Sequence, residues 1–206
     1  MKATKEIKEE SRRTFDGQAE NYDKGIDGKH ARQTYPVIID ALRAAAPKTV
    51  LDLGCGTGAL LAQVLKIESI EAAHGLDLSE KMLEQARSKL NGVPLVQGDS
   101  EHLPYENDSF DAVYCNDSFH HYPNPKAVLA EVKRVMKKGG IFILCDPYQQ
   151  PGALWLTNVF FRLTSTGHVR IYSQKELCSL VAEYFSSVEW RKVGSTAHMA
   201  FGINTM

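Results

Sequence analysis

The chain of 206 residues is poor in cysteine, with four residues that form no CxxC pair. Cys55, Cys115, Cys145 and Cys178 are widely spaced, so a disulfide framework is not expected. Two of them lie in apolar runs, where a buried free thiol is the ordinary outcome. The sequence therefore predicts free cysteines in a reducing compartment, and no metal site is expected.

Long hydrophobic runs and an excess charge of one sign are also missing. No stretch reaches the roughly 18 uninterrupted apolar residues that span a bilayer, and residues 1–13 are charged, unlike a signal peptide. Lys and Arg number 24 against 25 Asp and Glu. Nucleic-acid binders normally show a basic patch or a high pI, so we expect a cytoplasmic protein with no membrane span and no nucleic-acid partner.

Short apolar runs alternate with amphipathic segments through the middle of the chain. The pattern predicts parallel βαβ units with helices on both faces of a sheet. Expected strands are 49–54, 71–78, 93–97, 110–116 and 141–147, and expected helices are 29–46, 60–65, 80–90, 125–137 and 173–184. Ser79 is the expected N-cap of the helix 80–90. Two β-like runs at the C-terminal end are predicted to form an antiparallel hairpin around residues 194–196.

Residues 147–170 interrupt this alternation with a dense apolar cluster that includes Trp155, Phe160 and Phe161. The cluster is either a lid over a hydrophobic acceptor, or a helix packed on the sheet edge or against a partner in a homodimer. We favour packing, because aromatic clusters at helical spacing belong more often to a core. The predicted organisation is a single domain 1–206, divided into a helical entrance segment 1–46, a cofactor-binding core 49–147, a lid insertion 148–172, and a helix with a hairpin 173–206.

A glycine-rich turn follows the first predicted strand, with Gly54, Gly56 and Gly58. Glycine there permits positive φ and a close approach of a ligand to the backbone. Gly54, Gly56 and Ala59 also satisfy the GxGxxG/A dinucleotide fingerprint, so an NAD-dependent oxidoreductase is a competing interpretation. Asp77, at the end of the second strand, is placed to bind a ribose in either case.

Charge separates the two interpretations. Asp52 precedes the glycines, and no Lys or Arg occurs between Val50 and Leu65. A nearby carboxylate opposes the dianionic pyrophosphate of a dinucleotide, whereas it favours a cofactor that carries an ammonium and a sulfonium. Asp99, after the third strand, is placed to accept from an adenine amine. Acids at the ends of three neighbouring strands therefore favour S-adenosylmethionine.

Five segments carry a resemblance to a known family: VLDLGCGTG, GLDLS, QGDSEHLPYENDSFDAVYC, HHYPNP and KKGGIFILCDP, within residues 49–147. In their order and spacing they resemble class I S-adenosylmethionine-dependent methyltransferases, most of all the small-molecule branch of ubiquinone and menaquinone biosynthesis. FDGQAENYD, 15–23, is similar to the entrance motif of that branch, with aromatic residues near the cofactor. The resemblance implies a Rossmann-like doubly wound α/β fold with seven strands in the order 3-2-1-4-5-7-6, the seventh antiparallel.

The resemblance also implies ligand roles for S-adenosylmethionine. The backbone at Gly54 and Gly56, with the Asp52 side chain, would surround the methionine portion, and the backbone of Asn116 would lie near its amino group. The other implied cofactor-binding residues are Asp77 at the ribose, Leu78 and Met82 near the adenine, Asp99 and Ser100 at the adenine edge, and Tyr22 closing over the cofactor.

After the fourth strand the chain reads NDSFHH, where methyltransferases acting on exocyclic amines of bases or on glutamine often have an Asn/Asp-Pro-Pro-aromatic motif. This departure favours a small-molecule acceptor. His121 and His120 are candidate catalytic bases, because their loop should face the methyl group and an imidazole suits proton transfer near neutral pH. Each histidine could instead bond a backbone carbonyl and hold the loop. A non-catalytic cofactor-binding module that docks a partner through the hairpin is the remaining alternative.

Overall fold

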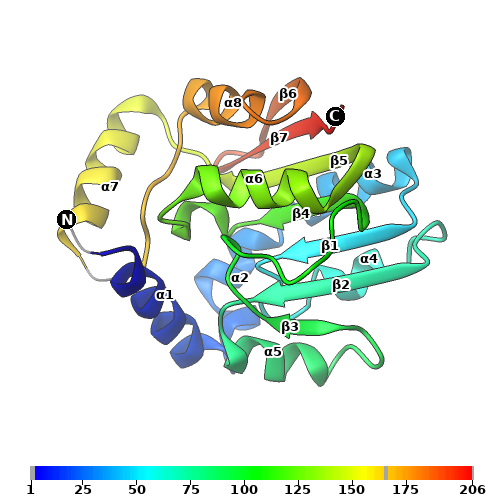
Figure 1. Ribbon diagram of the computed structural model, residues 1–206. Coiled ribbons are helices and arrows are strands. Elements are labelled where there is room, and N and C mark those ends of the chain that lie inside the picture. The colour runs from blue at the N-terminus through cyan, green and yellow to red at the C-terminus, as the bar shows by residue number, and fades with distance from the viewer. Residues whose placement is uncertain (1–2, 165–166, 206) are drawn as a thin grey trace.

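Seven strands form one sheet in the computed structural model, which describes residues 3–164 and 167–205 apart from the Arg162 side chain (Figure 1). Their order is β3-β2-β1-β4-β5-β7-β6. Strand β7 runs antiparallel to β5 and β6, and the other pairs are parallel. The predicted fold is therefore confirmed. The strands are β1 Thr49–Leu53, β2 Ala72–Asp77, β3 Leu95–Gln97, β4 Phe110–Asn116, β5 Met136–Pro147, β6 Ser186–Val193 and β7 Ala197–Ile203.

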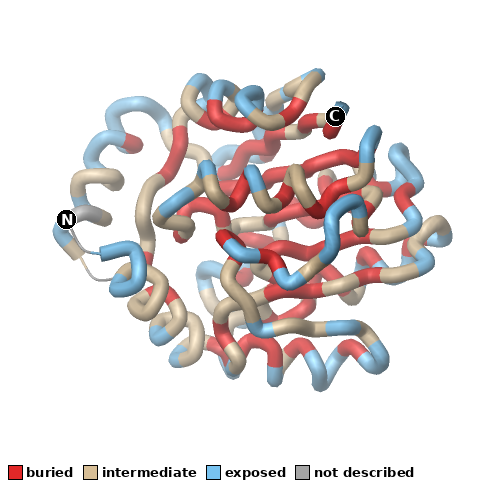
Figure 2. The backbone as a smooth tube through the Cα atoms, in the orientation of Figure 1, coloured by how far each residue is buried: buried red, intermediate tan, exposed pale blue. Residues whose placement is uncertain are grey.

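Helices cover both faces of this sheet. Because side chains alternate along a strand, Val50 of β1 packs with α3 and α4 while Leu51 and Leu53 pack with α6 and α8. Burial on both faces explains why the central strands are continuous apolar runs, and Figure 2 shows the buried residues following them. The helices are α1 Thr4–Gln18, α2 Ile26–Ala31, α3 Tyr35–Ala45, α4 Leu61–Val64, α5 Glu80–Arg87, α6 Pro125–Val135, α7 Pro151–Leu163 and α8 Gln174–Ala182, with 3₁₀ turns η1 Tyr22–Lys24 and η2 Phe119–His121.

The single helix predicted over 29–46 is wrong, because the structure divides this segment into α2 and α3. The reason is Pro36, which lies in the first turn of α3. A proline lacks the N–H that a continuing helix needs and clashes with the preceding turn, so it is tolerated only where a helix begins. The predicted cap is confirmed: the Ser79 side chain accepts from the backbone N–H of Met82 at the start of α5.

Helix α7 is not packed as a core helix. Among its described side chains Leu154 alone is buried, whereas Trp155 is 67% exposed and Phe160 56% exposed. Packing on the sheet edge, one of the two forms of the favoured prediction, is therefore wrong for these two aromatic residues. The lid and the homodimer remain predictions for this segment.

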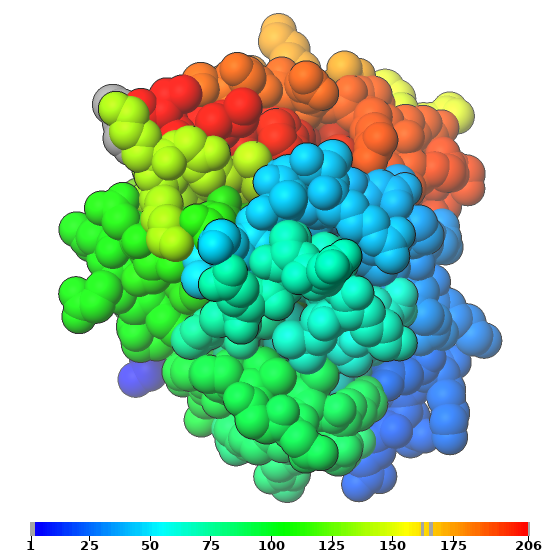
Figure 3. All heavy atoms as spheres, turned by 90° about the vertical axis from the view of Figure 1, so that its right-hand side faces the viewer, coloured from blue at the N-terminus to red at the C-terminus, as the bar shows by residue number. Residues whose placement is uncertain are grey.

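Helices α1 and α7 lie at the carboxyl ends of the parallel strands, on the left of Figure 1. Figure 3 faces the opposite end, where the blue atoms of the N-terminal segment reach only the edges of the view. All four cysteines are free, as predicted. Within the described part of the chain no helix has the length and apolar character needed to cross a bilayer.

Candidate functional site

A cavity opens at the carboxyl ends of β1, β2 and β4, roofed by α1. Ligands of doubly wound sheets bind at this edge. The structure brings together ten of the twelve predicted site residues in the lining of this cavity: Tyr22, Gly54, Gly56, Asp77, Leu78, Met82, Asp99, Ser100, Asn116 and His121. The two that do not line it are Asp52 and His120.

The turn after β1 depends on two glycines with left-handed backbone. Gly54 has φ of +77° and Gly56 has φ of +52°, a region that side-chain-bearing residues rarely adopt. A Cβ on Gly54 would lie 2.3 Å from Oγ of Ser118 and 3.0 Å from the hydroxyl of Tyr122, whereas one on Gly56 would meet nothing within 4 Å. Gly54 therefore lets the turn and the β4 loop approach each other, and Gly56 leaves backbone open to a ligand.

Asp77 holds this turn in place. Its Oδ2 accepts from the Gly56 N–H at 2.8 Å, and its Oδ1 accepts from the Ser79 N–H at 2.8 Å. Burial raises the pKa of Asp77 to about 6, although these backbone hydrogen bonds oppose the shift. The carboxylate is ionised above that pH, and each oxygen keeps a further lone pair for a hydroxyl donor.

Asp99 lies at the other end of the cavity and is already paired. Nζ of Lys8 on α1 is 2.7 Å from Oδ2 of Asp99 and 2.9 Å from Oε2 of Glu101. Burial by itself would raise the pKa of Asp99. The hydrogen bonds from Lys8 and from the Glu101 backbone outweigh this effect and hold the pKa of Asp99 below its usual value. An adenine amine bound here would share the Asp99 carboxylate with Lys8. No feature of the sequence around Lys8 predicted this contact.

A second lysine, Lys89, reaches the glycine turn from the segment that follows α5. Nζ of Lys89 donates to the Thr57 carbonyl at 3.0 Å and pairs with Asp23 at 2.6 Å. Although residues 50–65 contain no Lys or Arg, a cation from another part of the chain therefore contacts the turn. Both lysines are neutralised by carboxylates, however, so the lining keeps its acidic character.

Asp52 lies beneath the cavity floor. It is 1% exposed and neighbours Tyr114 across the β1–β4 pair. Among the described residues neither carboxylate oxygen has a hydrogen bond of good geometry, although the Tyr114 hydroxyl lies close enough to favour the ionised form. Burial raises the pKa of Asp52 well above its usual value. A direct contact between this side chain and the methionine portion is not supported by its position.

The loop after β4 supplies lining residues that the sequence analysis did not single out. Asp117, Ser118 and Tyr122 line the cavity, and the Ser118 hydroxyl donates to that of Tyr122 at 2.8 Å. The side-chain amide of Asn116 donates to the Ala31 carbonyl at 3.2 Å, so its side chain faces α2 and its backbone stays at the cavity. Asp117 and Ser118 lie in NDSFHH and Tyr122 directly follows it, so their position at the end of a strand was the signal that could have identified them.

A second cavity of about 300 Å³ adjoins the first. The two share four lining residues, Phe15, Tyr22, Asp117 and His121. Phe15 meets Tyr22 edge-on with ring centroids 6.1 Å apart, and meets His121 edge-on at 4.9 Å. Two aromatic rings, one imidazole and one carboxylate therefore lie where the two spaces meet.

Both candidate bases are buried at this second cavity. Nδ1 of His120 is 2.9 Å from Oδ1 of Asp146, and Nδ1 of His121 is 2.9 Å from the Gly167 carbonyl. Burial, reinforced by His120 and His168, lowers the pKa of His121 well below its usual value. Burial also opposes protonation of His120, but Asp146 raises its pKa. His121 is thus a neutral hydrogen-bonding group and a weak base, and the backbone bond foreseen for it is present.

His30 couples α2 to the β4 loop. Its Nδ1 lies 2.9 Å from Oδ2 of Asp117, a residue with φ of +55°, and its Nε2 lies 3.1 Å from the Thr196 carbonyl. Because both ring nitrogens of His30 face hydrogen-bond acceptors, the ring that is protonated on both nitrogens is favoured. The bond to Asp117 raises the pKa of His30 from 6.5 to about 9, against the effect of burial.

We expect replacement of His30 by glutamine to destabilise the fold in a pH-dependent way. A folded pKa above the unfolded one contributes stability that is complete below pH 6.5 and is lost as pH rises through 9. Allowing for solvent screening of this partly exposed group, His30→Gln should lower the free energy of unfolding by about 1–2 kcal/mol at pH 6 and by less at pH 9.5. Urea unfolding at both values measures the difference, and an equal loss at each would contradict the charged pair.

Comparison with known proteins identifies the class that this fold and cavity define. The family described as "Methyltransferase domain" matches residues 51–144. An S-adenosylmethionine-dependent methyltransferase structure from Thermotoga maritima superposes with a TM-score of 0.74 at 22% identity, covering 95% of this chain and 100% of that one. The YcgJ protein of Bacillus subtilis gives 0.71 at 22% identity, covering 85% and 99%. The fold is that of the Rossmann-like methyltransferases.

Relatives in sequence agree with the fold. A demethylmenaquinone methyltransferase of Thermotoga maritima is 33% identical, over 68% of this chain and 62% of its own length. The chloroplastic 2-methyl-6-phytyl-1,4-hydroquinone methyltransferase 1 of Oryza sativa subsp. japonica is 38% identical, over 54% of this chain and 34% of its own length. The chain thus covers less than two thirds of these relatives. Residues 51–144 belong to the methyltransferase domain family, which confirms the resemblance stated from the sequence.

Proposed function

We propose that this protein transfers the methyl group of S-adenosylmethionine to a small aromatic acceptor that carries hydroxyl groups. The observation that carries this proposal is the pair of adjoining cavities that share Phe15, Tyr22, Asp117 and His121. One cavity has acids and glycines suited to a nucleoside, and the other meets it at these four residues. Two reactants in neighbouring spaces are what an in-line displacement requires.

The residues of the first cavity suit this cofactor. Asp77, Asp99 and Asp117 line it, and its cation Lys8 is paired with Asp99 and Glu101. Such a lining favours a cationic ligand and opposes a pyrophosphate. When bound, the cofactor supplies a methyl group activated by a sulfonium.

The lining of this cavity supports the implied roles other than that of Asp52. The open backbone at Gly56, with Gly54 and Asn116, would surround the methionine portion. Asp77 would accept from the ribose hydroxyls, and Ser100 and Asp99 would meet the adenine edge between Leu78 and Met82. Tyr22, which lines both cavities, would close over the cofactor and exclude water from the methyl group.

The second cavity suits a ring-bearing acceptor. Phe15, Tyr22, Tyr148 and Phe161 give it aromatic walls, while His120 and His121 offer polar atoms. The relatives named for demethylmenaquinone and for a phytyl-hydroquinone support an acceptor of this class. His121, which lies where the two cavities meet, would accept a hydrogen bond from an acceptor hydroxyl.

Incubation with S-adenosylmethionine labelled in the methyl group tests the proposal against hydroquinones, monophenols and aliphatic amines. Label should enter the hydroquinones or phenols, because only these combine a ring for the aromatic wall with a hydroxyl for His121. Transfer to amines alone, or to no small molecule in a metabolite extract, would contradict it. The second result would favour the non-catalytic binding module.

Replacement of Asp77 by alanine should weaken binding of S-adenosylhomocysteine by about 1–3 kcal/mol, which is roughly 5- to 150-fold. The variant loses the acceptor for the ribose and also the anchor of the Gly56 N–H. Isothermal calorimetry at pH 7.5, above the pKa of Asp77, measures the loss.

Asp111→Ala is the matched control. Asp111 accepts from the backbone N–H groups of Thr49 and Lys48 at the amino end of β1, far from the cavity. This variant should lose stability while binding S-adenosylhomocysteine with unchanged affinity. Equal affinities of Asp77→Ala and the parent protein would remove Asp77 from the site.

A further inference from the structure

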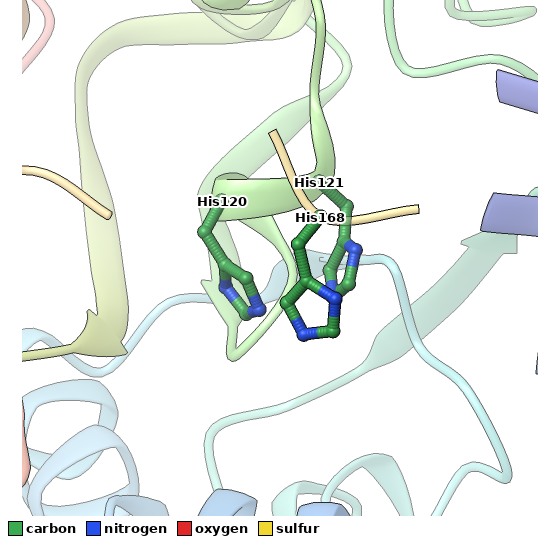
Figure 4. A group of neighbouring side chains, drawn as sticks. All are labelled: His120, His121 and His168. Atoms are coloured by element: carbon green, nitrogen blue, oxygen red, sulfur yellow. The ribbon is translucent and has the colours of Figure 1, made fainter. Parts of the chain in front are cut away.

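Three histidines gather at the second cavity from two distant parts of the chain. His120 and His121 belong to η2, and His168 follows α7. Their ring centroids lie 4.1 Å apart for His120 and His121, 4.4 Å for His121 and His168, and 5.3 Å for His120 and His168. Figure 4 shows the three rings side by side, and one ring nitrogen from each lies within 4.8 Å of the other two.

Hydrogen bonds orient two of these rings. A carbonyl oxygen only accepts, so the Nδ1 of His121 that faces Gly167 carries its proton, and the lone pair of the neutral ring is on Nε2. The Nδ1 of His120 faces the Asp146 carboxylate in the same way. Histidines that ligate metals almost always donate their other ring N–H to a carboxylate or a backbone carbonyl. Both kinds of partner are present here.

We propose that His120, His121 and His168 bind a divalent transition-metal ion of the Zn²⁺ type. Imidazole nitrogens suit zinc, copper, iron and nickel. Three protein ligands leave one position open, as in catalytic zinc sites. All three histidines line the second cavity, so the open position faces the space assigned to the acceptor.

The geometry needs a small adjustment to hold an ion. Zn–N bonds of 2.0–2.1 Å in a tetrahedral site place the donor nitrogens about 3.4 Å apart, compared with up to 4.8 Å here. Ring rotation and movement of the segment that carries His168 can close this difference. A second grouping, Asp117, His120 and Asp146, also has suitable distances. Its two carboxylates already accept from His30 and His120, so they support the rings as hydrogen-bond partners and not as ligands.

The ligand expected at the open position is a hydroxyl oxygen of the acceptor. With the ion bound, the Nε2 lone pair of His121 binds the metal, and the metal holds this oxygen in place of the hydrogen bond from the hydroxyl to His121. An ion there would stabilise the oxyanion when the hydroxyl loses its proton to water. This part rests on the proposed function, whereas binding of the ion to three imidazoles does not. His168 lies far from His120 and His121 in the sequence and approaches them only in the folded chain. The spacing of the three histidines therefore forms no metal-binding motif, and no metal site was expected from the sequence.

Metal binding is tested on the full chain after dialysis against a chelator. Calorimetry with ZnCl₂ should show one ion per chain, and Co²⁺ should give the visible absorption bands of a four- or five-coordinate site. His168→Ala should weaken binding at least about tenfold. The control is His102→Ala, which removes a histidine 83% exposed at its side chain and outside the group, and which should bind as the parent protein does.

Affinity for S-adenosylhomocysteine, measured without metal, shows whether each variant is folded and keeps the first cavity. No binding of Zn²⁺ or Co²⁺ at micromolar concentrations, or equal binding by His168→Ala and the parent protein, would overturn the metal site. Failure to transfer methyl groups would instead count against the proposed function and leave the metal titration unaffected. Stoichiometric binding with no dependence of turnover on metal would overturn the assignment of the acceptor oxygen to the open position.

Discussion

Replacement of Gly54 by alanine is expected to abolish binding of S-adenosylhomocysteine at micromolar concentrations and to lower the free energy of unfolding by about 2–5 kcal/mol. The methyl group would enter a left-handed residue, with φ of +77°, and would lie 2.3 Å from Oγ of Ser118. Either Gly54 or the β4 loop must move, and both line the first cavity. Calorimetry and urea unfolding measure the two effects.

Gly92→Ala is the control that separates the effect of the steric clash at Gly54 from the effect of backbone strain. Gly92 has a similar φ of +74°, but a Cβ there would meet nothing within 4 Å. Its alanine variant should lose only the 1–3 kcal/mol of a strained residue and bind S-adenosylhomocysteine normally. If Gly54→Ala and Gly92→Ala behaved alike in both measurements, the close packing of the turn against Ser118 would not matter for binding.

His121→Ala is the second change with a large expected effect. We expect kcat to fall about 10²-fold, because the ring lies where the two cavities meet and positions the acceptor hydroxyl through a hydrogen bond. Loss of a packed ring beside Phe15 contributes through misplacement of the acceptor. Affinity for S-adenosylhomocysteine should change far less than kcat.

His102→Ala serves as the control here too, with turnover equal to that of the parent protein. Full turnover of His121→Ala with normal cofactor affinity would remove His121 from the reaction. A rise in KM alone would assign it to acceptor binding without a role in the chemical step.

The sequence predicted the sheet and most of the first cavity because both depend on local signals. Apolar strands that are buried on two faces can be recognised from the sequence alone. So can the glycines and acids at the carboxyl ends of these strands. Residues such as Asp77 and Asp99 could therefore be placed without coordinates. Pro36 was also a visible signal, and neglect of its missing N–H produced the wrong continuous helix.

The remaining features depend on contacts between distant segments. Lys8 reaches Asp99 from α1, and Lys89 reaches Thr57 from the segment that follows α5, so the count of local charges around the glycines was incomplete. His168 joins His120 and His121 only when the segment after α7 crosses the β4 loop. The Asp52 side chain does not line the cavity for another reason, since it is buried beside Tyr114 of β4. Alternation along β1 governs its direction.

The central claim is that the first cavity binds an S-adenosyl nucleoside and not a dinucleotide. The most direct measurement is calorimetric titration of the unmodified protein with S-adenosylhomocysteine and, separately, with NAD. The account predicts saturable 1:1 binding of S-adenosylhomocysteine at micromolar concentrations or tighter, and no heat of binding from NAD. Saturable binding of NAD with none of S-adenosylhomocysteine would contradict it.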